Sequence, residues 1–392
     1  MKKALFIVLV FIKVCANTTT PLSTLQQQQI KTEQKINDYT SKKLKYDWIN
    51  PITASYTYTK NGQFDTTSSS QILKINLNQP IFKSGGIYFA IKYSNANREF
   101  LKLATSLKEK NLISKLYEVL LNLKKIDLQI KKQSYMIDNA NIDIFRKKEQ
   151  FQSGLIDSSF LNSAILNATT LKHQLLNLQS TRFELIKNFE NLSDQNYTTL
   201  IPPKFTLLDK EEFLKRSLDL KLAKSEIAKN RNLKNMMISS YFPTLSLFGN
   251  YSKNLNEDQR SFIKYGFSYG INISMPLFDI NRGENIELRR LELLKSKLEF
   301  QDKQKQMKNF YESIQKKIEI LQKRVNLAKE DEKLYDELLT NIRESYMIGQ
   351  KSSYDVDSLR NSKNSSSIDI KIYEIDIELE LLKLFMKVSD EI

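Results

Sequence analysis

The chain contains an internal duplication, and this sets narrow limits on its fold. Three landmarks, each a proline or a glycine in a similar local setting, occur twice in the same order. They are Pro51 and Pro243, Pro80 and Pro276, and Gly154 and Gly349. The copies lie 192, 196 and 195 positions apart. Because this period is too long for a solenoid repeat, we expect two structural halves built on one plan, residues 17–202 and 203–392.

Each half contains a very long segment without glycine or proline. One lies between Gly86 and Gly154 and the other between Gly283 and Gly349, spans of 68 and 66 positions. Since these two residue types are the poorest helix formers, we expect two helices of roughly 100 Å. Their apolar residues follow coiled-coil spacing, at Leu112, Leu116, Leu120, Leu123, Ile126 and Ile130, and at Ile318, Leu321, Val325 and Ala328.

A shorter return helix is expected after each turn glycine. Each return helix falls about 25 to 28 residues short of its outgoing partner. Two further helical stretches have about the length needed to fill this gap, so we expect them to stack end to end with the return helices. The return helices are 155–194 and 350–390, and the filling stretches are 22–47 and 209–241. Pro202-Pro203 marks the junction between the halves.

Each half also contains two segments in which apolar and polar residues alternate. A period of two indicates strands with one apolar and one polar face. The apolar positions are Tyr56 and Tyr58; Leu73, Ile75 and Leu77; Leu245, Leu247 and Tyr251; and Phe267, Tyr269, Ile271 and Ile273. The polar stretches 60–71 and 253–264 are expected to be the connecting loops.

This alternation fits a half-buried soluble sheet, and it equally fits a membrane barrel with lipid on one side and water on the other. Four strands cannot close a membrane barrel, because the smallest barrels use about eight. An open sheet edge is not tolerated in lipid. If these strands lie in a membrane, several chains must share one barrel. The alternative is a soluble antiparallel coiled coil with a small β cap.

Residues 1–16 have the pattern of a secretory signal. Lys2 and Lys3 precede an apolar segment, and Val14-Cys15-Ala16 forms a small-residue cleavage site, so the mature chain is expected to begin near Asn17. Lipidation of Cys15 is the competing interpretation, although the preceding lysine is a poor lead-in for it. After cleavage the chain has no cysteine, which removes disulfides and thiol chemistry.

The composition offers little support for catalysis, metal binding or nucleic-acid binding. The formal net charge is +15, but the lysines are spread along the chain instead of clustered. His173 is the only histidine and has no cysteine partner, so a surface role is favoured over a metal site. The sequence has no glycine-rich phosphate loop and no readable Ser/His/Asp set. We therefore expect no enzyme, no cofactor and no metal.

Taken in order, these features resemble the outer-membrane factor family, of which TolC is the best-known member. The resemblance covers nearly the whole mature chain. It lies in the duplicated strand–strand–long helix order, in Pro80-Ile81-Phe82 and Pro276-Leu277-Phe278, in the aromatic-x-x-Gly turns that end at Gly154 and Gly349, and in the stretch from Ser217 to Leu245. It implies an α+β membrane protein, a homotrimer whose protomers each give four strands to a twelve-stranded β-barrel and four columns to an α-helical coiled-coil barrel.

The resemblance also implies a function. The chain is expected to be the exit duct of a tripartite efflux or type I secretion system in the cell outer membrane, with a periplasmic helical tunnel. It would conduct drugs, metals or proteins passively, and its partners would be a periplasmic adaptor (membrane fusion) protein, an inner-membrane pump and outer-membrane lipid. A soluble periplasmic coiled-coil scaffold or adaptor is the alternative, and a surface adhesin or structural coiled coil is a third possibility.

By the same resemblance, the two helix-hairpin turns meet the adaptor and close the entrance. The expected adaptor contacts are Gly154, Leu155, Gly349 and Gln350. The family's closed entrance is held between the turns, here by Tyr346 and Lys351 on the second turn and Ser159 on the first. Position 160, a carboxylate in the family pattern, is Phe160, and Asp157 is the candidate substitute. Lys351 stands where the pattern has arginine, and it cannot make the same bidentate contact.

The family's pore constriction uses two aspartates, six and nine positions after the second turn glycine. Asp355 matches the first position, whereas Ser358 occupies the second and Asp357 lies one position before it. A threefold ring of Asp355 would concentrate negative potential at the entrance and favour cations. The other interpretation is that these are ordinary solvated helix carboxylates.

Overall fold

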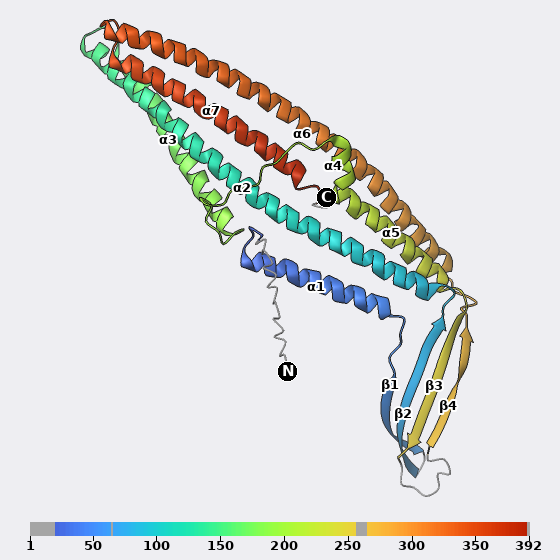
Figure 1. Ribbon diagram of the computed structural model, residues 1–392. Coiled ribbons are helices and arrows are strands. Elements are labelled where there is room, and N and C mark those ends of the chain that lie inside the picture. Colours follow the sequence, from blue (N-terminus) through green and yellow to red (C-terminus); the bar gives the residue numbers. More distant parts are fainter. Residues whose placement is uncertain (1–19, 64–65, 256–264, 390–392) are drawn as a thin grey trace, which may run out of the picture.

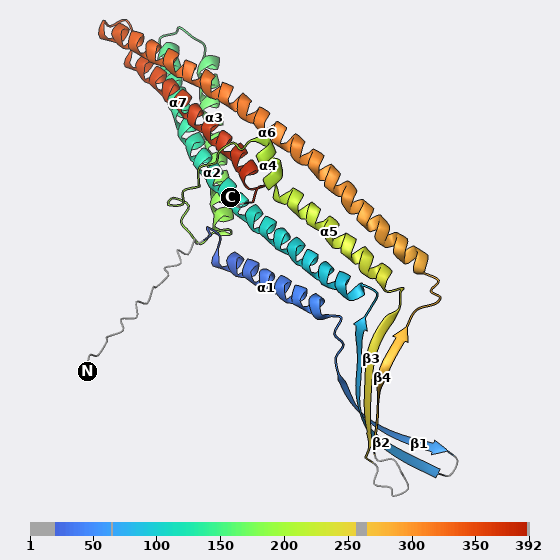
Figure 2. The same ribbon diagram turned by 45° about the vertical axis from the view of Figure 1, so that its right-hand side comes forward.

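The computed structural model describes residues 20–63, 66–255 and 265–389. The expected signal segment 1–16, with Cys15, lies outside these residues. A long helical body carries a four-stranded sheet that projects from one end (Figure 1), and the turns of the two helical hairpins lie at the other end. Figure 2 shows the same separation of the two ends from a second direction.

The same series of elements occurs twice. The first half comprises α1 (Thr24–Tyr46), β1 (Thr53–Gln63), β2 (Thr66–Phe82), α2 (Gly86–Gln152) and α3 (Ser158–Glu190). The second half comprises α4 (Lys210–Arg216), α5 (Leu218–Ser239), β3 (Thr244–Asn254), β4 (Tyr265–Ser274), α6 (Arg282–Met347) and α7 (Ser353–Phe385). The two long helices expected from the glycine- and proline-free segments are confirmed, with 67 residues in α2 and 66 in α6.

The two hairpin turns have the same geometry. Gly154 and Gly349 adopt φ values of +74° and +78°. One residue beyond each glycine, the backbone N–H of Leu155 donates to Gln150 O at 2.9 Å, and that of Gln350 donates to Ser345 O at 2.9 Å. Both turns are therefore Schellman helix ends, in which a glycine adopts the left-handed conformation at little cost.

The expected stacking of short helices on the return helices is also confirmed. Ser23 N donates to Leu192 O at 2.8 Å, which joins the start of α1 to the end of α3. Leu218 N donates to Lys387 O at 2.9 Å, which joins α5 to the end of α7. Donor and acceptor are each shifted by 195 positions between the two junctions, so one backbone bond is repeated in both halves.

The stretch 209–241, expected as one helix, is divided at Ser217. This residue leaves the helical conformation, with φ −56° and ψ 120°, and its hydroxyl caps α5 by accepting from Leu220 N. Its backbone pairs with Val388 in an isolated β-bridge. The break has a physical reason, because the junction with α7 uses backbone groups that a continuous helix would occupy.

The helices form four columns. Helix α2 packs against α1 and α3 on one side and against α5 and α7 on the other, and α6 packs against α5 and α7. The largest buried apolar cluster surrounds the middle of α2, where Leu116, Leu120 and Leu123 are almost fully buried. These are positions of the coiled-coil spacing read from the sequence. The outer columns are α1 with α3, and α6.

The sheet is an antiparallel meander in the order β1-β2-β3-β4. Its register pairs Tyr56 with Leu73, Ile75 with Tyr251, and Tyr251 with Phe267. Because directly paired residues point to the same face of a sheet, the apolar positions of all four strands share one face, as the alternation predicts.

The expectation that residues 60–71 form a loop is wrong. Strand β1 continues to Gln63 and β2 begins at Thr66, so most of this stretch is paired, with Thr59 opposite Ser70 and Asn61 opposite Ser68. A run of threonine and serine is compatible with a solvent-exposed strand as well as with a loop, because threonine has a high strand propensity. In the second expected loop, 253–264, β3 extends to Asn254, and residues 256–264 lie outside the described part of the chain.

Candidate functional site

The sheet presents a broad apolar face that the chain itself does not cover. Tyr269 is 81% exposed and Phe267 is 72% exposed, and neither face of the sheet lies against a helix (Figures 1 and 2). The outer edges of β1 and β4 have no neighbouring strand among the described residues. Large exposed apolar patches and open sheet edges both mark surfaces that bind something else.

The opposite end of the molecule presents a smaller apolar tip. Leu155 is 76% exposed, Met347 is 75% exposed, and Ile348 is also exposed. These residues flank the two turn glycines at which adaptor contacts are expected. A rigid Schellman turn with apolar residues at its apex provides a defined contact surface.

A ladder of polar side chains joins the two hairpins from α2 to α7. Lys125 pairs with Asp376 at 2.6 Å, Lys132 with Asp369 at 2.6 Å, Asn139 donates to Ser362 Oγ at 3.2 Å, and Arg146 pairs with Asp355 at 2.5 Å. From one pair to the next, the α2 residue number rises by seven and the α7 residue number falls by seven, as expected for antiparallel helices of a coiled coil. We call these four pairs the α2–α7 ladder. Sequence reasoning missed it, although the heptad spacing of the four α2 residues was a readable signal.

Asp355 is the last rung of the ladder and also caps α7. Its carboxylate accepts from Ser352 N at 3.0 Å, and Ser352 Oγ accepts from Asp355 N in return, a capping box. The backbone hydrogen bond from Ser352, followed by the Ser352 hydroxyl and the nearby Arg146 and Lys351 charges, holds the pKa of Asp355 below its ordinary value. The carboxylate is therefore ionised at neutral pH and bonded within its own protomer.

The two other residues expected at the constriction lie two and three residues after Asp355, within one turn of α7. Asp357 forms an ion pair with Arg360 at 2.8 Å. Ser358 contributes its carbonyl oxygen, which accepts from Asn139 Nδ2 at 3.2 Å. In the protomer, all three positions are engaged in contacts along or beside the α2–α7 ladder. Their place in a pore remains a prediction about the assembly.

The four residues expected to close the entrance lie on two separate turns. Asp157 caps α3 by accepting from Ser159 N at 2.8 Å, and this backbone bond lowers its pKa. Tyr346 and Lys351 are exposed on the second turn. Within the described ranges, no hydrogen bond or ion pair joins either of them to Ser159 or Asp157. The expected lock is therefore not made inside one protomer, and it stays a prediction.

No candidate metal site is found in the part of the chain that the structure describes. That part contains no group of three or more His, Cys, Asp or Glu residues able to hold a metal ion. His173 is exposed on α3. None of the described helices combines the length and apolar character needed to cross a membrane.

The fold is similar to that of several solved bacterial outer-membrane channels. No protein-family model and no curated protein matches the sequence. Among solved structures, VceC of Vibrio cholerae is 13% identical with a TM-score of 0.73, and the match covers 93% of each chain. The CmeC channel of Campylobacter jejuni is 15% identical with a TM-score of 0.71, covering 93% of this chain and 84% of that one.

A third solved structure is the open state of the MtrE outer membrane channel of Neisseria gonorrhoeae. It is 12% identical with a TM-score of 0.64, and the match covers 92% of this chain and 84% of that one. At such low identities the likeness defines the fold, which is shared over nearly the whole described chain. The α+β fold with two strand–strand–long helix units, expected from the sequence, is confirmed.

Proposed function

We propose that the chain is a passive exit duct in the outer membrane, and that it works as a homotrimer. The observation that carries this proposal is the uncovered apolar sheet face with two free edges, held at one end of a helical body roughly 100 Å long. Lipid covers such a face, and further strands satisfy such edges. Three copies supply twelve strands, enough for a closed barrel.

The helical body supports the same assembly. Its outer columns are α1 with α3, and α6, so three copies bring α6 of one protomer beside α1 and α3 of the next. Exposed apolar residues on α6 recur every seven positions, at Ile320, Leu327 and Leu334. On α3, Leu166, Leu176 and Phe183 are also exposed. Apolar stripes on both outer columns favour a coiled-coil seam between copies.

The turn end supports the proposed partners. Exposed Leu155, Met347 and Ile348 form a tip that suits a periplasmic adaptor protein, which would link the duct to an inner-membrane pump of an efflux or type I secretion system. The duct contributes no chemistry in this proposal. A ring of Asp355 from three copies would make the entrance selective for cations. This requires that the Asp355 carboxylate either leaves Arg146 or faces the pore while it remains paired with Arg146.

The test is channel conductance of the purified mature chain in a planar bilayer, with trimer mass measured in detergent. We expect discrete openings from a protein that needs detergent to leave the membrane, and a lower cation preference in Asp355→Ala. A conducting channel with unchanged selectivity would remove Asp355 from the constriction and leave the duct intact. A monomer that stays soluble without detergent and conducts nothing would support a periplasmic scaffold instead.

A further inference from the structure

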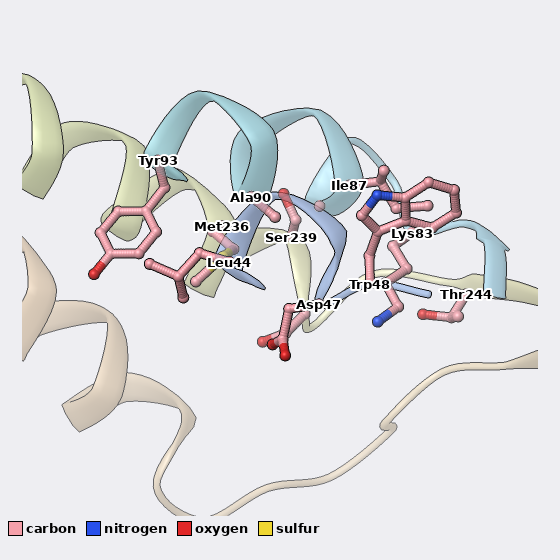
Figure 3. Close-up of a pocket in the computed structure, with 12 residues that line it drawn as sticks. Leu44, Asp47, Trp48, Lys83, Ile87, Ala90, Tyr93, Met236, Ser239 and Thr244 are labelled. Atoms are coloured by element: carbon pink, nitrogen blue, oxygen red, sulfur yellow. The ribbon is translucent and has the colours of Figure 1, made fainter. Parts of the chain in front are cut away.

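A cavity of about 300 Å³ lies at the junction of the helical body and the sheet (Figure 3). It lies between the end of α1, the start of α2 and the end of α5. Trp48 and Lys83 stand at one side, and Leu44, Ile87 and Met236 contribute apolar walls. Trp48 lies just before β1, and Lys83 directly follows β2. The cavity therefore sits at the level where the apolar sheet face begins.

Two hydrogen-bond donors at this cavity have no partner among the described residues. Within the described ranges, neither the Lys83 ammonium group nor the Trp48 indole N–H makes a hydrogen bond or an ion pair. Among the residues that line the cavity, the one carboxylate is Asp47, and within the described ranges it makes no ion pair with Lys83. A cation and an indole N–H beside apolar walls suit an anion that carries an apolar tail.

The surroundings of the cavity are basic and aromatic. The last turn of α1 carries Lys43 and Lys45, and Lys45 lies over the ring of Tyr46 at 5.7 Å from its centroid. On the α2 side, Lys92 lies over the ring of Tyr88 at 5.5 Å. Aromatic rings with lysines are typical of the boundary between lipid and water. Ammonium groups at that boundary attract anionic lipid headgroups.

The corresponding junction of the second half is built from different side chains. There Tyr241 is buried, Asn285 Nδ2 donates to its hydroxyl at 3.1 Å, and the Arg282 guanidinium lies over its ring at 5.3 Å. The same plan thus gives a junction whose aromatic and polar side chains contact one another in the second half, and a cavity with free donors at the end of α1. Residues of both halves line the cavity, but its two free donors, Trp48 and Lys83, come from the first half.

We propose that this cavity binds the phosphate headgroup of an anionic phospholipid from the membrane leaflet that meets the helical body. Lys83 pairs with the phosphate, the Trp48 indole N–H donates to a phosphate or ester oxygen, and the acyl chains lie along the apolar sheet face near Ile52 and Phe82, both exposed. This site rests on the proposed membrane insertion of the sheet. It would fix the depth and orientation of the barrel relative to the leaflet.

Trp48 is the only tryptophan of the chain, so its fluorescence reports on the site alone. The chain is reconstituted in phosphatidylcholine vesicles that contain a minor fraction of either brominated phosphatidylglycerol or brominated phosphatidylcholine. We expect the anionic quencher to act with about fivefold higher apparent affinity, the effect of one lysine near an anionic surface. Lys83→Gln should abolish this preference, and Lys83→Arg should keep it.

Lys172→Gln is the matched control, because it removes the same charge from an exposed position on α3, far from the sheet. It should leave the preference unchanged. Equal quenching by both lipids in the wild type, or an unchanged preference in Lys83→Gln, would overturn the site. Displacement of the anionic quencher by inorganic phosphate at low concentration would also overturn it, because the ligand would then be free phosphate.

Flotation with the vesicles and channel conductance are recorded on the same samples. Protein that floats and conducts but shows no lipid preference overturns this inference and leaves the proposed duct standing. Protein that does not float overturns both. Retained conductance in Lys83→Gln shows that the variant is folded.

Discussion

The two ends of the molecule differ in how many of their contacts the chain itself supplies. At the sheet end, apolar side chains such as Phe267 and Tyr269 stand uncovered, and two strand edges are open. At the turn end, charged side chains are already paired across α2 and α7, and the turn glycines complete their own helix ends. The sheet end therefore needs a surrounding that the chain does not supply, whereas the turn end pairs its charged side chains within one protomer and leaves only a small apolar tip exposed.

This difference separates the forces that act on each end. The sheet depends on burial of apolar surface, which scales with the area covered by lipid and by neighbouring copies. The turn end depends on directional pairs at fixed register, which a change of a single side chain can break. A variant at the sheet end should therefore affect insertion and assembly, whereas one at the turn end should affect local opening.

The largest effect is expected from a charge on the apolar sheet face. Tyr269→Arg places a guanidinium where we propose lipid, at a cost of about 2–4 kcal/mol near the bilayer centre. We expect loss of co-flotation with vesicles and of heat-resistant trimer. Ser268→Arg, one residue away on the polar face, is the control and should insert. If both variants insert equally well, the apolar face does not face lipid.

The next effect concerns the α2–α7 ladder. Lys132→Asp sets a carboxylate opposite Asp369 in a partly buried site, which should cost about 2 kcal/mol. Hydrogen exchange of the α7 amides measures the local opening that results. The double variant Lys132→Asp with Asp369→Lys should recover most of the protection, because it restores an ion pair of reversed polarity. Equal exchange rates in the single and double variants would show that the pair does not couple the hairpins.

The parts of the fold predicted from the sequence are those governed by local rules. The glycine- and proline-free segments defined α2 and α6, and Gly154 and Gly349 defined the turns. Period-two alternation defined which face of each strand is apolar. The heptad spacing of the four α2 residues of the ladder was readable, but their partners were not. The pairing depends on the register between two helices that lie more than 200 residues apart, and no local spacing sets that register. The prediction of a loop at 60–71 was wrong because serine and threonine occur both in loops and in solvent-exposed strands.

The contacts of the candidate site were harder to predict from the sequence for the same reason. Asp355 was singled out by its distance from a turn glycine, which indicates where it lies along α7. Its partner Arg146 belongs to the other hairpin, and only the packing of α2 against α7 brings the two together. Lys83 and Trp48 likewise meet because three helix ends converge at the sheet, a property of tertiary structure that no motif encodes.

The turn glycines should show a smaller effect. Gly154→Ala and Gly349→Ala should each cost about 1 kcal/mol, because a side chain disfavours the left-handed conformation. Gly283→Ala is a matched control: a Cβ meets nothing within 4 Å at any of the three sites, and Gly283, at the start of α6, has no positive φ. Thermal unfolding in detergent should show lower midpoints for the two turn variants and an unchanged or higher midpoint for the control.

The smallest effect is the pH dependence of the start of α7. Because the folded-state pKa of Asp355 lies below its ordinary value of 3.8, the carboxylate stabilises the fold above that value. This stability is lost as the pH falls through the folded-state pKa. Hydrogen exchange of the first α7 turn should therefore accelerate in acid relative to the neighbouring Gly349 turn, after correction for intrinsic rates. Asp355→Asn should open this turn at neutral pH and remove the acid step. Arg146→Gln should raise the midpoint of that step and keep it, since the Ser352 bonds remain. An acid step that persists in Asp355→Asn would assign the titration to another group.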